Sequence, residues 1–406
     1  MLTLIPTSHF SGIVQVPGSK SISNRVLLMD FLAEGESEFF GILESDDTKY
    51  MRDALENIKN KKTDLFLGNA GTAMRSLTAA LCIGTGEYIL RGEPRMHERP
   101  IKDLVDALRT LGAKIEYLEN DGYPPLKINA CGLNGGTVHI KGNISSQFLT
   151  ALLIAAPYCK KTLEIIVDGE LISKPYVYMT IRLMEKFGIK VENDDYKNFK
   201  VEKGTYKAQS LKIEGDASSA SYFWAAAAIT KGNMLVQGVE KDGLQGDVMF
   251  LDVLEKMGAE LNGVTVDATL FPDAAMTICP LACYAQGKTK ITGITSWKVK
   301  ETDRIAAMAN ELRKVGAEVL AGDDFIEITP PEIIKAATIE TYNDHRMAMC
   351  FSLLSLNSPR KKGAEITILN PECVNKTYPG YFKEFIRLRG EHSCTHPVSA
   401  GFFCGV

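Results

Sequence analysis

The sequence GNAGTAMRS at residues 68–76 leads directly into the small, apolar stretch LTAAL at residues 77–81. Residues without bulky side chains let backbone N–H groups come close to a ligand, and the positive end of a helix dipole faces the same way. We therefore predict that a helix begins here at an anion-binding site.

Similar helix starts recur along the chain, and this internal repetition indicates a repeat architecture. The other starts lie at residues 18–25, 143–147, 215–219, 272–275 and 343–346. A second, amphipathic type of helix is predicted where apolar residues recur at helical spacing and a Gly follows. These helices are expected at residues 101–111, 177–187, 250–257 and 305–315. The predicted unit is a small-residue helix, strands, an amphipathic helix and further strands. Each unit is too short to bury its own faces, so the units must pack together.

The position of the repeats predicts two lobes. Three starts precede residue 215 and three follow, so we expect a crossover there and a second one near Pro17 and Gly18. The predicted lobes are residues 18–214, and residues 1–17 plus 215–390, with a loosely held tail at 391–406. Residues 1–16 should form a strand of the second lobe, and residues 196–209 a polar, exposed hairpin.

The composition is that of an ordinary soluble globular protein. The chain has 406 residues, of which 45% are hydrophobic and 24% charged, with a net charge of -4 and a pI near 6.0. These values argue against a nucleic-acid partner held by a general basic field. Any anion site must therefore be local.

Targeting and metal-binding signals are not evident. The N-terminus has no basic segment followed by an apolar one, and no apolar run approaches the ~20 residues of a membrane span. Of the 9 cysteines, only Cys279 and Cys283 are close in sequence, and we interpret them as packing residues of a helix. We expect a cytoplasmic monomer without a membrane partner, metal or cofactor.

Basic residues gather at or beside the helix starts. If the units of each lobe point their helix starts the same way and the lobes face each other, these cations converge on one cleft, which suits more than one phosphate or carboxylate. A nucleotide-binding P-loop is excluded because Ser19 and Val14 stand where that motif needs Gly. The basic residues are Lys20, Arg25, Arg75, Arg99, Lys300, Arg304, Arg346 and Lys376.

Two carboxylates stand at these helix starts, Asp273 after Pro272 and Glu301 after Lys300, and we expect them to lie among the cations. A positive field favours their charged forms, which suits a base better than an acid. Neutral donors are available from Ser21, Ser145, Ser146 and Ser173. There is no Ser-His-Asp order, no nucleophilic Cys in a basic loop and no hydride-cofactor fingerprint. The chemistry indicates noncovalent group transfer between two anionic substrates.

Taken in order, several blocks resemble the 5-enolpyruvylshikimate-3-phosphate (EPSP) synthases, a family of enolpyruvyl transferases. The resemblance runs from about residue 17 to 382. It implies a two-lobed inside-out α/β barrel in which each lobe has three βαβαββ units, and it implies transfer of an enolpyruvyl group from phosphoenolpyruvate to shikimate 3-phosphate in the pathway to chorismate and the aromatic amino acids. The blocks are residues 17–21, 67–75, 98–101, 145–151, 215–223, 272–277, 300–304 and 343–347.

The resemblance also implies residue roles. Asp273 would accept the 5-hydroxyl proton, and Glu301 or Lys20 would protonate C3 of phosphoenolpyruvate, giving a tetrahedral intermediate that loses phosphate. Shikimate 3-phosphate would be bound by Lys20, Ser21, Arg25, Ser145, Ser146, Ser173, Asp273, Ser296 and Lys300. Phosphoenolpyruvate would be bound by Lys20, Gly71, Arg99, Gln147, Arg304, Arg346 and Lys376.

Two positions depart from the family pattern. Ser76 stands where the family usually has Pro, and Ser296 where Asn is common. We hypothesise that Ser76 weakens inhibition by glyphosate; compensation by its neighbours is the alternative.

Two other functions are alternatives to the EPSP synthase interpretation. A UDP-N-acetylglucosamine enolpyruvyl transferase would carry a reactive Cys, which residues 94–100 lack. A non-catalytic phosphate-binding scaffold would have lost at least one of Lys20, Asp273, Glu301 or Arg346.

Overall fold

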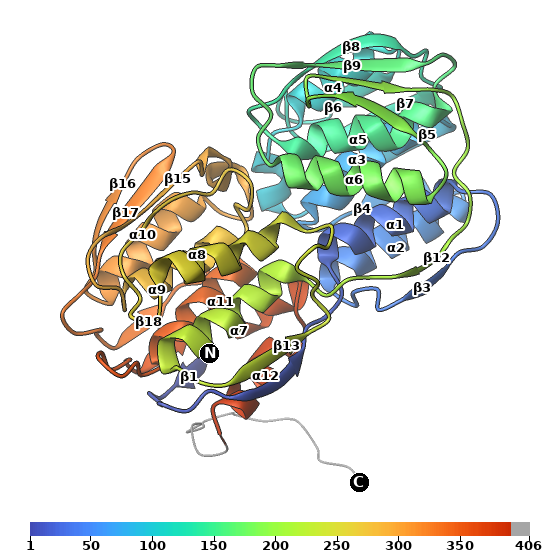
Figure 1. The fold of residues 1–406 in the computed structure, drawn as a ribbon. Coiled ribbons are helices and arrows are strands. Elements are labelled where there is room, and N and C mark those ends of the chain that lie inside the picture. The colour runs from blue at the N-terminus through green and yellow to red at the C-terminus, as the bar shows by residue number, and fades with distance from the viewer. Residues whose placement is uncertain (391–406) are drawn as a thin grey trace.

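The computed structural model describes residues 1–390, and these form two lobes that lie side by side (Figure 1). The first lobe is built on a hydrophobic cluster of residues between Ile22 and Ile213. The second is built on a cluster that combines Leu4–Val16 with residues from Ala220 to Leu388. The tail expected at 391–406 lies outside the described residues.

The first lobe contains the following elements. Its helices are α1 (Lys20–Leu32), α2 (Asp46–Lys59), α3 (Gly71–Cys82), η1 (Pro94–Glu98), α4 (Lys102–Thr110), α5 (Ser146–Ala155), η2 (Ala156–Tyr158) and α6 (Lys174–Lys186). Its strands are β3 (Glu38–Phe40), β4 (Asp64–Phe66), β5 (Thr85–Arg91), β6 (Lys114–Tyr117), β7 (Leu126–Cys131), β8 (Gly136–Lys141), β9 (Leu163–Asp168), β10 (Val191–Asp194), β11 (Asn198–Val201) and β12 (Ser210–Lys212).

The second lobe contains the remaining elements. Its helices are α7 (Ala217–Thr230), η3 (Gly246–Met249), α8 (Phe250–Met257), η4 (Ala274–Thr277), α9 (Ile278–Ala282), η5 (Thr295–Val299), α10 (Arg304–Lys314), α11 (His345–Ser352), η6 (Leu353–Ser355), η7 (Pro371–Lys376) and α12 (Tyr381–Leu388). Its strands are β1 (Leu2–Leu4), β2 (Gly12–Gln15), β13 (Met234–Gln237), β14 (Thr265–Asp267), β15 (Thr289–Thr292), β16 (Glu318–Ala321), β17 (Phe325–Thr329), β18 (Ala337–Ile339) and β19 (Ile366–Ile368).

The same sheet topology occurs in β4-β5-β7-β6, β8-β9-β11-β10 and β14-β15-β17-β16. In each, the first two strands are parallel and are joined through a helix, and the last two form an antiparallel hairpin. The smaller sheets are β1-β19-β18, β13-β2 and β12-β3. This repetition confirms the βαβαββ unit. The sheets are open and separate, so their strands do not close into a barrel.

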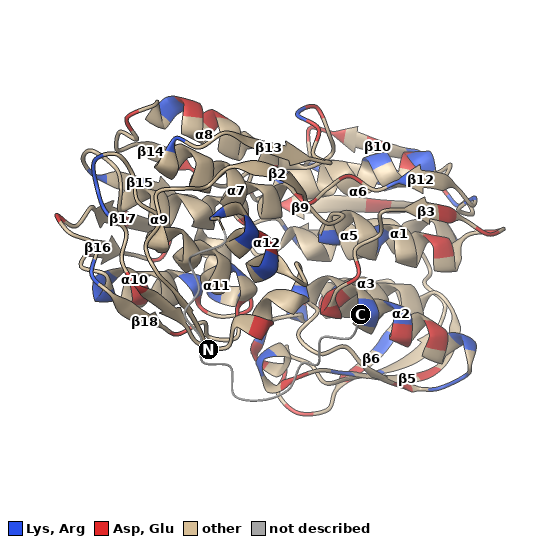
Figure 2. Ribbon diagram, turned by 90° about the horizontal axis from the view of Figure 1, so that it is seen from below, with Lys and Arg blue, Asp and Glu red and all other residues tan. Residues whose placement is uncertain are grey.

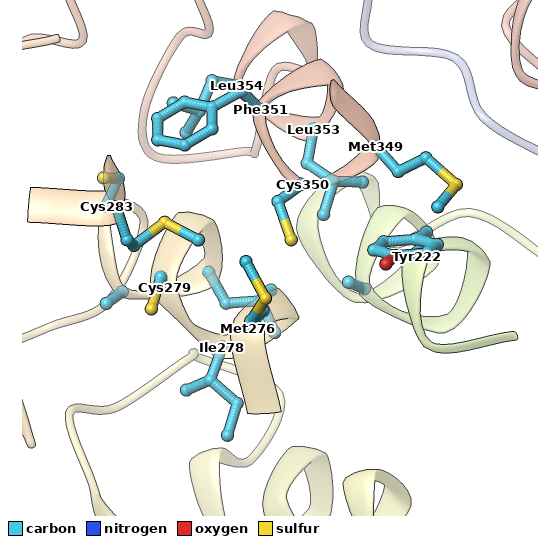
Figure 3. Packing of buried hydrophobic residues seen from close by; sticks show 14 of the residues in the cluster. Tyr222, Met276, Ile278, Cys279, Cys283, Met349, Cys350, Phe351, Leu353 and Leu354 are labelled. Atoms are coloured by element: carbon cyan, nitrogen blue, oxygen red, sulfur yellow. The ribbon is translucent and has the colours of Figure 1, made fainter. Parts of the chain in front are cut away.

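Helices occupy the interior of each lobe and sheets lie outside, as Figure 1 shows. The residues of α3, α5 and α11 are nearly all buried, as expected for helices whose residues are mostly apolar or small. Figure 3 shows how Tyr222 of α7, Met276, Cys279 and Cys350 pack together in the second lobe. Cys279 and Cys283 are buried free thiols, in agreement with their interpretation as packing residues.

The expected helix ends are present, with one difference. The Gly after each amphipathic helix has a positive φ, as in Gly112 (+97°) and Gly316 (+97°). The start at residues 272–275 leads into η4 and the short α9 and not into one continuous helix. Pro280 explains the difference because proline removes one N–H from the α-helical ladder.

The two crossovers between the lobes lie side by side. Ser19 N donates to Glu214 O at 2.7 Å, and Asp216 N donates to Pro17 O at 2.8 Å. Residues 1–16 form two strands instead of one: β1 pairs with β19, and β2 pairs with β13. The N-terminal segment therefore completes sheets of the second lobe.

The exposed hairpin expected at residues 196–209 is not fully exposed. Phe199 and Tyr206 are buried in the first-lobe cluster, and Tyr206 Oη donates to Ile154 O at 3.0 Å. Alternate residues of β11 face the helices, and a polar average over the segment hides this alternation.

Charged residues of both signs are distributed over the periphery of both lobes on the side seen in Figure 2. Interior helices such as α5 and α7 contain none. Among residues 1–390, no helix combines the length and apolar character that crossing a bilayer would require.

Candidate active site

A cleft between the lobes collects helix starts that are far apart in the sequence. It holds about 870 Å³, including the space that opens to solvent. The predicted residues that line it are Lys20, Ser21, Arg25, Gly71, Arg75, Arg99, Ser145, Ser146, Gln147, Ser173, Asp273, Ser296, Lys300 and Glu301. Three further predicted residues, Arg304, Arg346 and Lys376, lie behind this lining and contact its carboxylates.

The helices α1, α3, α5 and α6 all begin at this cleft. Ser19 Oγ caps α1 by accepting from Ile22 N at 3.5 Å, and Ser145 Oγ caps α5 by accepting from Gln147 N at 3.2 Å. The start of α3, after Ala70, has no side-chain cap. Its first N–H groups are therefore available to an anion.

Gly71 and Arg99 are in close contact at the start of α3. A Cβ atom on Gly71 would lie 2.5 Å from Arg99 Nη2, so only glycine lets the guanidinium approach the helix so closely. Arg99 Nη1 donates to Asn69 O at 3.0 Å and to Asn69 Oδ1 at 2.9 Å. Burial lowers the pKa of Arg99, with Glu301 partly opposing the shift. The N-terminus of α3 therefore has beside it a buried guanidinium whose hydrogen-bond partners are neutral.

Arg25 lines the cleft, but its donors are engaged by protein atoms. Nε donates to Thr180 Oγ1 at 2.8 Å, Nη1 to Ser21 O at 2.8 Å, and Nη2 to Tyr176 O at 3.3 Å. Burial lowers the pKa of Arg25 to about 10. This residue ties α1 to α6 and adds positive charge beneath the cleft.

Lys20 and Lys376 share a carboxylate that sequence analysis missed. Asp47 is buried, with Oδ2 at 3.6 Å from Lys20 Nζ, and Lys376 Nζ donates to Asp47 and to Asn69 O at 2.9 Å. Since Lys376 belongs to the second lobe, these bonds connect the lobes. Asp47 lies in the first turn of α2, where Ser45 N donates to Thr48 Oγ1 at 3.0 Å and the helix start is capped.

Arg304 organises the second-lobe side of the cleft. Its Nε donates to Asp344 Oδ2 at 2.7 Å, its Nη1 to Asp273 Oδ1 at 3.1 Å and its Nη2 to Glu301 Oε2 at 2.8 Å. The side chain is buried, and these carboxylates raise the pKa of Arg304 although burial alone would lower it. One guanidinium therefore fixes the spacing of three carboxylates.

Asp273 is surrounded by cations. Arg346 Nη2 lies 3.0 Å from Oδ2, and Lys300 Nζ lies 3.6 Å from Oδ1. Burial alone would raise the pKa of Asp273, but Arg346, Lys300 and Arg304 lower it well below its usual value. The carboxylate is ionised at neutral pH and can accept a proton at the cleft.

Glu301 has a similar environment. Burial alone would raise the pKa of its carboxyl, but Arg304, Arg99 and Lys376 lower it well below its usual value. Glu301 is therefore ionised before substrate binds. Because Arg304 of the second lobe and Arg99 of the first lobe both act on it, this carboxylate lies where the two halves of the cleft meet.

Other functional candidates were missed because they are not basic residues at a helix start. Tyr176 and Thr72 line the cleft, and Asp344 and Asp247 lie behind it as partners of Arg304 and Tyr176. The block at residues 343–347 contains Asp344, and this was the available signal. Within residues 1–390, no group of three His, Cys, Asp or Glu residues is arranged to hold a metal ion.

Comparisons with known proteins agree on one family. A family model described as EPSP synthase (3-phosphoshikimate 1-carboxyvinyltransferase) matches residues 5–65 and 57–385. The 3-phosphoshikimate 1-carboxyvinyltransferase of Sulfurovum sp. (strain NBC37-1) is 52% identical, over 94% of this chain and 97% of that protein. That of Shewanella sp. (strain W3-18-1) is 51% identical, over 96% and 99%. The solved EPSP synthase of Acinetobacter baumannii shares the fold, with a TM-score of 0.78 and 24% identity over 98% and 99% of the two chains.

Proposed function

This chain belongs to the EPSP synthase family, and we propose that it transfers the enolpyruvyl group of phosphoenolpyruvate to the 5-hydroxyl of shikimate 3-phosphate, releasing phosphate. The observation that carries the proposal is Asp273, an ionised carboxylate held by Arg304, Arg346 and Lys300 in a cleft lined with further cations. A base among cations suits deprotonation of a hydroxyl between two anionic substrates.

The first step forms the bond between the substrates. Asp273 accepts the proton of the 5-hydroxyl as that oxygen bonds to C2 of phosphoenolpyruvate, and C3 takes up a proton. The product of this step is a tetrahedral intermediate. In the second step its C2–O bond to phosphate breaks and a C3 proton is lost, which restores the double bond.

The proton for C3 comes from Glu301 or Lys20. Glu301 is ionised in the free protein and must first gain a proton, whereas a lysine ammonium already carries one. Glu301→Gln and Lys20→Met separate these roles in a single-turnover experiment with C3-deuterated phosphoenolpyruvate. The variant of the donor abolishes exchange of the C3 hydrogens with water, and the variant of a binding residue retains it at saturating substrate.

Substrate binding is divided between neutral and basic side chains. The proposed ligands of shikimate 3-phosphate are Lys20, Ser21, Arg25, Ser145, Ser146, Ser173, Asp273, Ser296 and Lys300. The proposed ligands of phosphoenolpyruvate are Lys20, Gly71, Arg99, Gln147, Arg304, Arg346 and Lys376. All of these residues lie in or directly behind one cleft, which supports a role for them in substrate binding.

The proposed lobe boundaries, 18–214 and 1–17 with 215–390, place nine of these fifteen residues in the first lobe and six in the second. The contact of Lys376 with Asp47, and donation by Arg95 Nη2 to Lys300 O at 3.1 Å, both cross between the lobes. We expect the lobes to separate without substrate and close on shikimate 3-phosphate. X-ray scattering with and without this ligand tests the closure; an unchanged radius of gyration contradicts it.

Phosphate release provides the test of function. Purified protein is mixed with phosphoenolpyruvate and either shikimate 3-phosphate or UDP-N-acetylglucosamine. Release only with shikimate 3-phosphate is expected, release with the sugar nucleotide assigns the other transferase, and release with neither supports a scaffold. The cytoplasmic and monomeric state proposed for the protein is tested by fractionation and by sedimentation.

A further inference from the structure

Asp247, at the start of η3, connects the first lobe to the backbone of Asp273. The residue is only 4% exposed. Oδ2 accepts a hydrogen bond from Tyr176 Oη of α6 at 2.8 Å, and Oδ1 accepts one from Ala274 N at 2.8 Å. Because Ala274 directly follows Asp273, the carboxylate of Asp247 binds both a first-lobe residue and the peptide bond between Asp273 and Ala274.

The segment that carries Asp247 packs tightly against the first lobe. A Cβ atom on Gly246 would lie 2.5 Å from Pro175 Cβ and 3.0 Å from Leu270 O, so glycine is required for this approach. The preceding Gln245 accepts from Ala217 N at 3.0 Å and donates to Gly215 O at 2.7 Å. The two residues that precede Asp247 are therefore held by contacts with both lobes.

The charge of Asp247 has a cost in stability. Burial and the neighbouring charge of Asp273 raise the pKa of Asp247 to about 6, while Arg346 of α11 and the hydrogen bond from Tyr176 oppose this shift. The folded state thus binds the proton of Asp247 more tightly than the unfolded chain. As pH rises through this range, ionising Asp247 destabilises the fold. A costly buried charge is typical of functional sites.

We propose that Asp247 is a positioning residue that fixes Asp273 for proton transfer and makes its placement depend on contact with Tyr176 in the first lobe. This inference rests on the proposed function, in which Asp273 is the base. Asp247 does not line the cleft, so it acts through Asp273 and not on a substrate. Since its two hydrogen bonds come from different lobes, the base is fully held only when the lobes are together.

Two substitutions of Asp247 test the proposal. Asp247→Ala removes both hydrogen bonds and is expected to lower kcat about 10- to 100-fold, with KM for phosphoenolpyruvate changed less than about threefold. Asp247→Asn keeps the shape of the side chain and recovers part of kcat. Its amide oxygen can accept from Ala274 N, and its amide nitrogen can donate to Tyr176 Oη. Unchanged kcat in Asp247→Ala, or no recovery in Asp247→Asn, overturns the proposal.

The melting temperature distinguishes positioning from a structural role and needs no substrate. At pH 8, Asp247→Asn is expected to melt at a higher temperature than the wild type, because it removes a buried charge, and this gain should disappear as pH falls toward 4. A lower melting temperature of Asp247→Asn at pH 8 indicates a structural residue and overturns the proposal. Asp252→Asn is the control, since Asp252 is an exposed aspartate on α8 and its removal should change neither kcat nor melting.

The pH profile of kcat/KM gives a third readout. In the wild type, activity is expected to fall below about pH 6 as Asp247 gains its proton. Substrate phosphates also ionise near this pH, but they do so equally in Asp252→Asn and in Asp247→Asn. The proposal is supported if the inflection near pH 6 is smaller in Asp247→Asn than in the wild type and in Asp252→Asn. Identical profiles of the three proteins overturn it.

If an Asp247 variant does not fold, Tyr176→Phe removes only the hydroxyl that Asp247 binds. It is expected to lower kcat, and unchanged kcat overturns the link between the lobes. Absence of phosphate release by the wild type would instead refute the proposed function, and the melting comparison would still report on Asp247.

Discussion

The two halves of the cleft hold their arginines in different ways. In the first lobe, Arg25 and Arg99 donate to hydroxyl, carbonyl and amide oxygens, which carry no net charge, and burial lowers their pKa. In the second lobe, Arg304 and Arg346 donate to carboxylates such as Asp273, and the pKa of both is raised although burial alone would lower it.

This difference indicates a division of labour. A guanidinium among neutral dipoles keeps an uncompensated charge and attracts an anion, whereas one in an ion pair fixes its partner and sets the pKa of that partner. The first-lobe half is thus suited to holding phosphate and carboxylate groups. The second-lobe half is suited to holding the base.

The strongest test of this division is removal of the base. Asp273→Ala should lower kcat about 10²- to 10⁴-fold because general-base catalysis is lost. Shikimate 3-phosphate should still bind within about tenfold of its wild-type affinity, since most of its charge contacts remain. Turnover is measured by phosphate release and affinity by calorimetry, with Asp252→Asn as the control. Parallel loss of binding and turnover would make Asp273 a positioning residue.

The next test removes a cation that sets the pKa of the base. Arg346→Gln should raise the pKa of Asp273, because the pKa is depressed by neighbouring cations. Activity requires ionised Asp273 and is lost as pH falls through its pKa. In the Asp247→Asn background, where residue 247 does not titrate, the acid limb of the kcat profile should therefore move to higher pH, by about 1 to 3 pH units. An acid limb that stays in place would show that Arg346 does not control the base.

A smaller effect is expected from the first lobe. Arg99→Gln should raise KM for phosphoenolpyruvate about 10- to 150-fold, the value of a charge-assisted hydrogen bond of about 1.5–3 kcal/mol. The acid limb should not move, because Arg99 is not among the main influences on Asp273. Arg91→Gln is a matched control, since Arg91 is half-exposed and pairs with Asp64 at the surface. A shifted acid limb in Arg99→Gln would break the comparison.

The smallest effect is expected at Ser76, which is buried within α3, whose start contacts Arg99. Ser76→Pro restores the residue usual in the family and removes one helical N–H. We expect glyphosate to inhibit this variant a few-fold more strongly, consistent with the ~1 kcal/mol scale of a small shift in a pocket. An unchanged inhibition constant would show that the neighbours of Ser76 already compensate.

Much of the fold could be predicted from the sequence. The helix starts at Gly71 and Ser146 and the positive φ of Gly112 follow from local backbone requirements, which neighbouring residues express. The buried Tyr206 was not predicted because it lies in a polar segment whose burial depends on a distant helix. Pro280 was a local signal that the helix beginning at residues 272–275 is interrupted.

The site could be predicted only in part. Glu301 was found because it follows Lys300 in the sequence, and Asp273 because it stands at the repeated helix start of residues 272–275. Asp47 and Asp247 were not, because their partners Lys376 and Tyr176 are remote along the chain. A buried carboxylate without a basic neighbour in sequence resembles any helix-capping residue until its partners are located.

The sequence by itself determined where helices begin and end, because capping and backbone freedom depend on a few adjacent residues. It also determined which basic residues stand at or beside those helix starts. Only the tertiary structure decided which of those cations are neutralised by carboxylates, as in Arg304 with Asp344, which lies 40 residues further along the chain. Electrostatic pairing depends on distance in space, and packing of the two lobes sets that distance.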